Sequence, residues 1–447
     1  MSEEGAAALW CELAWLGGER AEPGVLIELE GDRIASVSSG VASAPPSANA
    51  LMGLTTPGIA NAHSHAFQRA LRGRTQAERG DFWSWRRRMY EVAEAIDPES
   101  YRALARATYG EMALAGITAV GEFHYLHHAP GGAPYEDPNA MGQALIEAAR
   151  EAGIRITLLD ACYLHGGIGE EVDAVQRRFS DGSAEAWAQR VSALEVGEGA
   201  RQGAAIHSVR AVDPDAAAVV AALAAQRSWP LHAHVSEQPA ENEDCLAAYG
   251  RTPTAVLAEA GALSERFTAV HATHLADRDF ELLGRRCGVC LCPTTERDLA
   301  DGVGPARRLA EAGARLSVGT DSHALIDPFE EARAIELDER LASGVRGGNT
   351  AAELLRAATA GGARSIGWPE CGRIEAGALA DLVTVGLESV RLAGTSPQRA
   401  VESVVFAGAA ADVRDVIVGG RFIVRDGAHL GLDVAGELRE AIAGVPA

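Results

Sequence analysis

The feature that most restricts the fold is an alternation between short apolar segments and Ala-rich segments with helical spacing, from about Pro57 to Trp368. Such alternation predicts parallel strands joined by helices. With a strand at Ile59 the apolar segments number eight, which favours a distorted (β/α)8 TIM barrel with its active site at the carboxyl ends of the strands. The other expected strands are Ile117–Val120, Arg155–Asp160, Ala204–His207, Pro230–His234, Thr268–His271, Val289–Cys292 and Arg315–Asp321.

Both ends of the chain look different from this central part. Residues 1–56 contain short strand-like segments separated by turns, too few for an independent core. Strand-like segments return near the C-terminus at Ala380–Val385, Val413–Val418 and Arg421–Val424. We therefore expect residues 1–56 and 369–447 to form one small β-sandwich domain, beside a catalytic barrel of residues 57–368.

Composition excludes several classes of function. The net charge is −22, and no basic tail or basic helix is visible, which argues against nucleic acid and anionic membranes as partners. No apolar run reaches the ~18 to 20 residues that span a bilayer. The acidic N-terminus lacks the basic region of a secretory signal, so we expect a cytoplasmic protein.

All 40 basic residues are arginine, and the chain contains no lysine. This excludes Schiff-base chemistry on lysine, pyridoxal phosphate attachment, a phosphate-binding loop lysine and a two-metal site bridged by carboxylated lysine. The seven cysteines are odd in number and scattered, which argues against a disulfide framework. Cys287, Cys290 and Cys292 could suggest thiolate ligation of zinc, but their apolar setting favours packing within a strand.

Histidines and carboxylates gather at the ends of four expected strands. His63 and His65 end the first strand, His232 and His234 the fifth and His271 the sixth, while Asp321 ends the eighth. Three imidazoles and a carboxylate can hold a divalent ion and leave a position open for water. Spacing alone does not choose between His232 and His234.

The motifs Pro-Gly-x-x-x-x-His-x-His, His-x-His-x-x-Glu and Gly-Thr-Asp-Ser resemble the amidohydrolase superfamily, in its mononuclear aminohydrolase branch. The resemblance covers nearly the whole chain. It implies one divalent metal ion, zinc above all, with iron or manganese as alternatives, and the ligands His63, His65, His234 and Asp321. It also implies catalytic roles for Asp321, Glu237 and His271. Metal coordination would lower the pKa of water toward ~7, and the two carboxylates would move protons.

Further polar residues near the strand ends bear on the substrate. Arg86 and Arg210 offer planar guanidinium groups suited to carboxylates, which indicates a small dicarboxylate substrate. The motifs Asn-x-His-Ser-His-Ala-Phe-Gln-Arg, Phe-Trp-Ser-Trp-Arg and His-Ser-x-Arg resemble the formimidoylglutamate deiminase family. The resemblance implies hydrolysis of N-formimino-L-glutamate to N-formyl-L-glutamate and ammonia, in histidine degradation. The substrate-binding residues that it implies are Gln68, Arg86, Tyr125, His207 and Arg210.

Several alternatives stay open at this point. A related aminohydrolase acting on a nucleobase or amidine ring would keep the metal site but use aromatic stacking and amide contacts. A non-catalytic metal-binding protein on the same fold would not need Glu237 and His271. Arg86 begins a run of three arginines that could be a solvated helix face, and Tyr125 could be a core ring. A homodimer is possible because related barrels often dimerise.

Overall fold

The computed structural model describes residues 7–76, 80, 82–284 and 286–445. Its centre is an eight-stranded sheet whose neighbouring strands are parallel and follow the chain order. A bridge between Ser64 and Asp321 joins the first strand to the segment after the last, which nearly closes the barrel. This confirms the barrel and all eight expected strands. They are β5 (Ile59–Ser64), β6 (Ile117–His124), β7 (Arg155–Cys162), β8 (Ala200–Ile206), β9 (Leu231–Val235), β10 (Phe267–His271), β11 (Gly288–Leu291) and β12 (Arg315–Val318).

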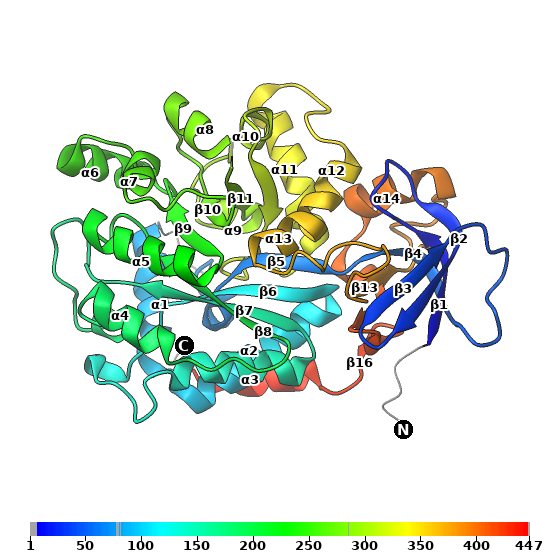
Figure 1. Ribbon diagram of the computed structural model, residues 1–447, viewed down its shortest axis with the longest axis horizontal. Coiled ribbons are helices and arrows are strands. Elements are labelled where there is room, and N and C mark those ends of the chain that lie inside the picture. The colour runs from blue at the N-terminus through cyan, green and yellow to red at the C-terminus, as the bar shows by residue number, and fades with distance from the viewer. Residues whose placement is uncertain (1–6, 77–79, 81, 285, 446–447) are drawn as a thin grey trace.

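Helices surround this barrel (Figure 1). Local sequence sets their ends: Asp97 accepts a hydrogen bond from Ser100 N–H at the start of α2, and Gly153, with φ 77°, ends α3. The helices are α1 (Phe82–Ala95), α2 (Pro98–Leu114), α3 (Ala140–Ala152), α4 (Ala184–Ser192), α5 (Pro214–Arg227), α6 (Pro239–Tyr249), α7 (Pro253–Glu259), α8 (Asp277–Gly284), α9 (Pro293–Asp298), α10 (Ala306–Glu311), α11 (Pro328–Ser343), α12 (Ala351–Arg356), α13 (Gly362–Ser365), α14 (Ala400–Ala407) and α15 (Val434–Ala443). Short 3-10 helices include η1 (Ala66–Leu71) and η3 (Gln176–Phe179).

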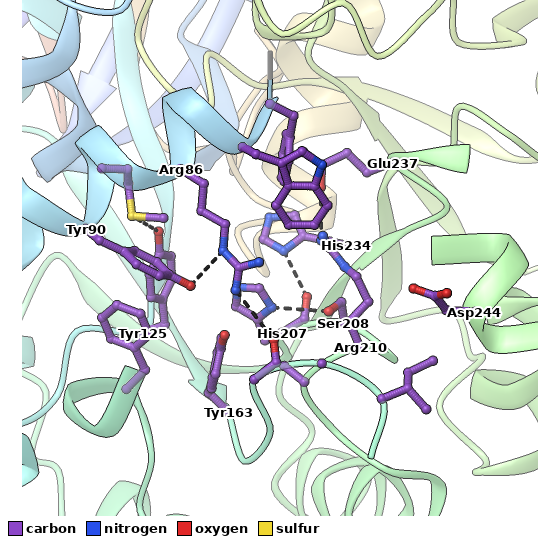
Figure 2. Close-up of a pocket in the computed structure, with 18 of the residues that line it drawn as sticks. Arg86, Tyr90, Tyr125, Tyr163, His207, Ser208, Arg210, His234, Glu237 and Asp244 are labelled. Carbon is purple, nitrogen blue, oxygen red and sulfur yellow. Dashed lines mark hydrogen bonds and ion pairs between the residues drawn. The ribbon is translucent and has the colours of Figure 1, made fainter. Parts of the chain in front are cut away.

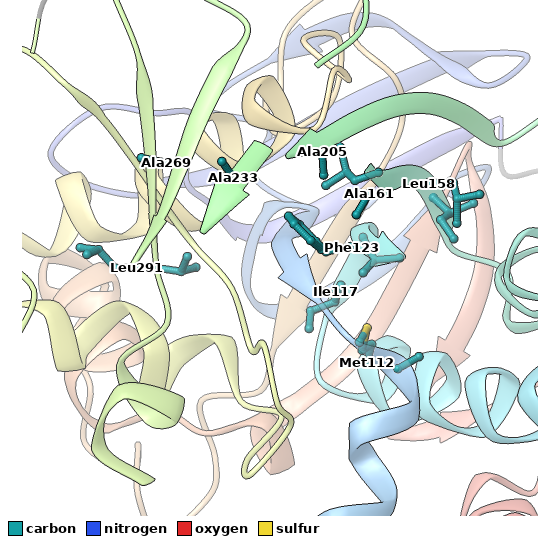
Figure 3. Close-up of a cluster of buried hydrophobic side chains, with 14 of the residues drawn as sticks. Met112, Ile117, Phe123, Leu158, Ala161, Ala205, Ala233, Ala269 and Leu291 are labelled. Atoms are coloured by element: carbon teal, nitrogen blue, oxygen red, sulfur yellow. The ribbon is translucent and has the colours of Figure 1, made fainter. Parts of the chain in front are cut away.

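The main core lies between the barrel strands and these helices. Ala161, Ala205, Ala233 and Ala269 come from four successive strands and belong to one buried cluster (Figure 3). Side chains alternate along a strand, so Ala233 faces opposite to its neighbour His234. The apolar face of β9 therefore packs in the core, while His234 is free to face the barrel interior.

Segments from both chain ends share a second, mixed sheet of eight strands, seen beside the barrel in Figure 1. This confirms that the two ends meet. Their junction is the antiparallel pairing of β4 with β13, in which Leu382 lies opposite Pro57. In sheet order the strands are β16 (Ala428–His429), β15 (Arg421–Arg425), β14 (Val413–Val418), β13 (Leu382–Val385), β4 (Asn49–Pro57), β1 (Ala8–Ala14), β2 (Glu22–Glu30) and β3 (Arg33–Ser38).

The terminal sheet is tied to the barrel by a buried ion pair. Arg155 of β7 donates two hydrogen bonds to the Asp381 carboxylate, at 2.7 and 2.9 Å, and Gly419 N–H donates to the same carboxylate. Helices α14 and α15 of the C-terminal segment pack on the barrel helices α11, α12 and α2. The division at residues 57 and 368 stays a prediction. Among the described residues, no helix is both long and apolar enough to cross a membrane.

Candidate active site

Four side chains converge at the carboxyl end of the barrel. The Nε2 atoms of His63 and His65 each lie 3.3 Å from Asp321 Oδ1. The Nε2 atom of His234 lies 3.1 Å from Nε2 of His63. All four residues are buried. The residues predicted to bind a metal are therefore brought together from β5, β9 and the segment after β12.

Hydrogen bonds fix which ring nitrogens are free. His65 Nδ1 lies 2.9 Å from the Phe123 carbonyl, and His234 Nδ1 lies 2.8 Å from the His207 carbonyl. A carbonyl only accepts, so each Nδ1 carries the proton and each Nε2 presents a lone pair. Burial lowers the pKa of His63, His65 and His234, which keeps these imidazoles neutral. A buried group of lone pairs and a carboxylate oxygen fits a divalent cation such as zinc.

Backbone strain is concentrated around this cluster. The backbone φ is 44° at Asp321, 52° at Ser236 and 67° at His271. All three values lie in the left-handed region, which residues other than glycine rarely adopt. Paired backbone bonds hold the Asp321 segment in place, since its N–H donates to the His63 carbonyl and its carbonyl accepts from His65 N–H. Where Ser64 and Asp321 close the barrel, the backbone of Asp321 is thus strained and its carboxylate lies beside two imidazoles.

The predicted proton-transfer residues lie next to this cluster. His271 Nε2 is 3.8 Å from Glu237 Oε1 and 3.9 Å from Asp321 Oδ2. Its other nitrogen, Nδ1, lies 3.3 Å from Glu296 Oε1. Burial opposes protonation of His271, but the surrounding carboxylates outweigh it and raise its pKa well above the ordinary value. His271 can therefore carry an N–H toward the cavity.

The cluster lies in a cavity of about 580 Å³. Its wall includes all five residues predicted to bind substrate, in addition to His65, His234, Glu237, His271 and Asp321. Figure 2 shows Arg86 of α1, His207 after β8 and His234 of β9 gathered around this space. The substrate-binding residues are Gln68 of η1, Tyr125 after β6, His207 and Arg210 after β8, and Arg86 of α1.

Three of these residues form a neutral, polar wall. Gln68 Nε2 donates to the Tyr125 hydroxyl at 3.0 Å, and Gln68 Oε1 is buried without a hydrogen-bond partner among the described residues. This oxygen can accept an N–H from a ligand. Burial lowers the pKa of His207 well below its ordinary value, and Arg210 adds to the effect, so this imidazole stays neutral. Tyr125 is both a core ring and a wall residue.

The two arginines lie in different surroundings. Arg210 NH2 lies 3.1 Å from Glu237 Oε2, and its Nε lies 3.7 Å from the buried Glu241 carboxylate. Arg86 Nε donates to the Tyr90 hydroxyl at 2.7 Å, and its guanidinium lies over the rings of Trp83 and Tyr90. In contrast to Arg86, the side chains of the next two arginines are exposed and do not line the cavity.

Other candidate ligands have different surroundings. His232 Nε2 lies 2.9 Å from the Ser365 carbonyl, as expected for a structural neighbour of His234. Cys287, Cys290 and Cys292 are buried, and Cys290 and Cys292 belong to an apolar cluster. Cys292 alone of the three lies within reach of His271 and Asp321. Among the described residues, these cysteines form no thiolate cluster of their own.

The structure adds wall and support residues that sequence reasoning missed. Tyr90, Tyr163 and Gln176 surround Arg86, Glu241 approaches Arg210, and Glu296 approaches His271. Glu296 lies on α9, 25 positions after His271, and belongs to none of the sequence motifs named above. A tyrosine on a helix or a glutamine in a short 3-10 helix gives no sequence signal that separates it from an ordinary packing residue.

A parallel barrel whose strand ends gather imidazoles and carboxylates around one cavity defines a class of hydrolases. The chain belongs to the Amidohydrolase family, whose model matches residues 54–423. It is 39% identical over 409 residues to the formimidoylglutamate deiminase of Pseudomonas aeruginosa, covering 86% of this chain and 89% of that protein. The chain is thus a hydrolase of C–N bonds.

Two further relatives place this similarity in context. A 5-methylthioadenosine/S-adenosylhomocysteine deaminase of Natronomonas pharaonis is 32% identical, covering 87% of this chain and 85% of its own length. The crystal structure of an amidohydrolase from Brucella melitensis superimposes with a TM-score of 0.91 at 35% identity, covering 98% of this chain and all of that one. The family thus includes proteins named for different substrates.

Proposed function

We propose that the protein hydrolyses N-formimino-L-glutamate to N-formyl-L-glutamate and ammonia in histidine degradation. The observation that carries this proposal is the position of Arg86 and Arg210 in the wall of the cavity that His65, His234 and Asp321 also line. Two guanidinium groups suit a substrate with two carboxylates. Similarity to the Pseudomonas deiminase supports the same substrate.

We further propose that His63, His65, His234 and Asp321 bind one zinc ion. When bound, such an ion makes water a stronger nucleophile at neutral pH and polarises the group attacked. Water then adds to the formimino carbon, both of its protons reach the substrate nitrogen in turn, and ammonia leaves. The carbon keeps the water oxygen, which gives the formyl product.

The protein side chains move and direct the protons in this reaction. Asp321 Oδ2 faces His271 rather than the other imidazoles and can accept a proton from water. Glu237, beside His271, carries that proton to the leaving nitrogen. His271 presents its Nε2–H to the reacting oxygen, while Glu296 holds Nδ1 on the opposite side of the ring.

The remaining wall holds the glutamate part of the substrate. Arg86 and Arg210 bind carboxylates, while Tyr125, His207 and Gln68 supply hydrogen bonds. These groups are needed because the net charge of −22 repels an anionic substrate from the protein as a whole. Arg210 lies beside Glu237, whereas Arg86 pairs with no carboxylate among the described residues. A nucleobase would leave Arg86 without a charged partner, which disfavours that alternative.

An ammonia-release assay with metal analysis on the same sample tests the proposal. Formiminoglutamate is compared with guanine, cytosine and 5-methylthioadenosine under identical conditions. We expect rapid release from formiminoglutamate alone and about one zinc per chain. Faster release from a ring substrate would overturn the substrate assignment, and bound metal with no turnover would favour a binding protein.

A further inference from the structure

A buried glutamine organises the hydrogen bonds around Arg86. Gln176 begins η3 and is 3% exposed. Its side-chain Oε1 accepts a hydrogen bond from the Asp173 backbone N–H at 2.8 Å, while the backbone N–H of Gln176 donates to the Asp173 carboxylate. A backbone N–H can only donate, so these contacts identify the oxygen end of the amide. The NH2 end therefore points the other way, toward the cavity wall.

This NH2 group meets two tyrosines. Gln176 Nε2 lies 2.9 Å from the Tyr163 hydroxyl and 3.0 Å from the Tyr90 hydroxyl, with the Gly166 carbonyl farther away at 3.4 Å. An amide nitrogen carries two hydrogens, and the two shorter contacts use both. Each phenol oxygen thus accepts a hydrogen bond from Gln176.

Tyr90 accepts a second hydrogen bond from Arg86 Nε at 2.7 Å. A guanidinium only donates, so both lone pairs of the Tyr90 oxygen face N–H donors. The Tyr90 proton must point elsewhere. Tyr90 and Tyr163 also interact with each other, so one phenol can donate to the other. One phenolic proton of the pair then still has no acceptor among the described residues.

Both tyrosines line the cavity, and Figure 2 shows Arg86, Tyr90 and Tyr163 directed toward the same region. Burial raises the pKa of Tyr163 far above the ordinary value, so its hydroxyl is protonated and can donate. A cavity region that offers phenolic and guanidinium donors, and in which the nearby hydroxyl lone pairs are already used, suits an anion.

We propose that Tyr90, Tyr163 and Gln176 determine specificity for one carboxylate of the substrate. Gln176 is a positioning residue: it donates to both phenols and so turns a phenolic O–H toward the carboxylate that Arg86 binds. This inference rests on the proposed function, because it assumes a substrate with carboxylates. The inference goes beyond the proposed function because it names the residues that recognise one of the two carboxylates.

The first test measures binding of N-formyl-L-glutamate by calorimetry, without turnover. Tyr90→Phe and Tyr163→Phe keep the rings and remove only the hydroxyls. One of the two substitutions removes the phenolic proton that faces the cavity. Loss of its hydrogen bond to a charged group predicts roughly 10-fold to 100-fold weaker binding for that variant. Tyr135→Phe is the matched control, since its hydroxyl lies 3.4 Å from Arg178 and Tyr135 does not line the cavity. Wild-type affinity in both cavity variants would overturn the proposal.

Ligands that lack one carboxylate make the test more specific. N-formyl-4-aminobutyrate lacks the α-carboxylate, and N-formyl-norvaline lacks the side-chain carboxylate. We expect the tyrosine variants to weaken binding of the one ligand that keeps the carboxylate near Arg86, and to leave the other unchanged. Equal effects on both ligands would indicate general damage to the cavity and contradict the proposal.

Gln176→Glu tests the direction of the hydrogen bonds. The glutamate keeps one oxygen for Asp173 N–H but replaces the NH2 donor with an acceptor, which draws the phenolic protons away from the cavity. We expect binding of N-formyl-L-glutamate to fall by roughly 100-fold or more, with metal content and Tm close to those of Gln176→Leu. Stronger binding in Gln176→Glu than in Gln176→Leu would contradict the proposal. If Gln176→Glu does not fold, the tyrosine variants decide.

Failure of this inference and failure of the proposed function give different results. Wild-type protein that binds N-formyl-L-glutamate but releases no ammonia from formiminoglutamate would overturn the reaction and leave the carboxylate site standing. Wild-type protein that turns over formiminoglutamate, with product binding indifferent to Tyr90, Tyr163 and Gln176, would do the reverse. No binding of N-formyl-L-glutamate by the wild type would overturn the carboxylate site.

Discussion

The guanidinium of Arg210 lies 3.1 Å from the carboxylate of Glu237. A residue expected to bind the substrate therefore touches the residue expected to move a proton. Both side chains are largely buried, at 21% and 9% exposure, so the contact is poorly screened by solvent. A substrate carboxylate that binds Arg210 would compete with Glu237 for the same donors, which couples recognition to the proton-transfer group.

Replacing Arg210 by Met should lower kcat/KM for formiminoglutamate by roughly 100-fold or more, because a buried carboxylate loses its charged donor. Metal content should not change. Steady-state kinetics and metal analysis on one preparation check this. Arg297→Met is the control, since Arg297 pairs with Asp338 on the exposed surface. Unchanged kinetics in Arg210→Met would remove Arg210 from the substrate site.

Replacing Glu237 by Gln should lower kcat by roughly 1,000-fold, because the amide cannot carry a proton to the leaving nitrogen. The fold and the bound metal should be retained. Glu243→Gln, at an exposed position of helix α6, which begins just after Glu237, should behave like the wild type. Ammonia release at saturating substrate measures the effect, and wild-type turnover in Glu237→Gln would reject the proton-transfer role.

Glu296 should act on catalysis only through His271. Glu296→Gln removes the carboxylate that lies 3.3 Å from His271 Nδ1, while Cys292 N–H can still donate to the remaining oxygen. We expect kcat to fall by roughly 10-fold to 100-fold with little change in KM. Asp298→Asn on the same helix α9 is exposed and serves as the control. A change in KM alone would instead indicate a binding role.

Removal of the metal should be visible as a loss of stability. Zinc at 100 times its Kd stabilises a folded protein by about 2.7 kcal/mol. The metal-free wild type should therefore gain several degrees in Tm when zinc is added, and Asp321→Asn or His234→Ala should gain little. His165→Ala, at a partly exposed histidine paired with Asp213, should respond like the wild type. Calorimetry checks this without an activity assay, and an equal zinc response in His234→Ala would contradict the ligand assignment.

A buried ion pair away from the cavity should control stability in acid. Burial opposes ionisation of Asp160, but Arg190, which donates to both of its oxygens, outweighs it and lowers the pKa of Asp160 to about 2. A lowered pKa stabilises the folded state above the ordinary value of 3.8, and this stabilisation is lost as the pH falls toward about 2. The contribution is about 2 kcal/mol.

Urea unfolding of the wild type and Asp160→Asn between pH 5 and pH 2 tests this. The wild type should lose its advantage over Asp160→Asn as the pH falls through this range. Asp277→Asn removes a carboxylate whose side chain is 95% exposed, and should parallel the wild type at every pH. A constant difference between wild type and Asp160→Asn would contradict the assignment.

The barrel and its central cluster could be predicted because both depend on local patterns. Apolar strands alternate with helices, and His63, His234 and Asp321 lie at strand ends, where the fold brings side chains together. The strand Asn49–Pro57 was not predicted, because its residues do not alternate and it contains Gly53. That glycine has a φ of 120°, and a Cβ there would meet the Val385 carbonyl at 2.2 Å.

The surroundings of Arg86 show the opposite case. Tyr90 follows it by one helical turn, but Tyr163 comes from the end of a distant strand and Gln176 from the short 3-10 helix η3. Their roles depend on which lone pairs and protons remain unused once all three meet. Such a count requires the positions of the atoms, so sequence patterns do not contain it.

The seam between Ser64 and Asp321 also has a consequence for synthesis of the chain. His63 and His65 leave the ribosome early, whereas Asp321 emerges only after seven further barrel segments have been made. An incomplete chain therefore lacks a carboxylate at the converging imidazoles, and its β4 strand still awaits β13. Metal capture and barrel closure would be late events in folding, so a bound ion would mark molecules that have completed the barrel.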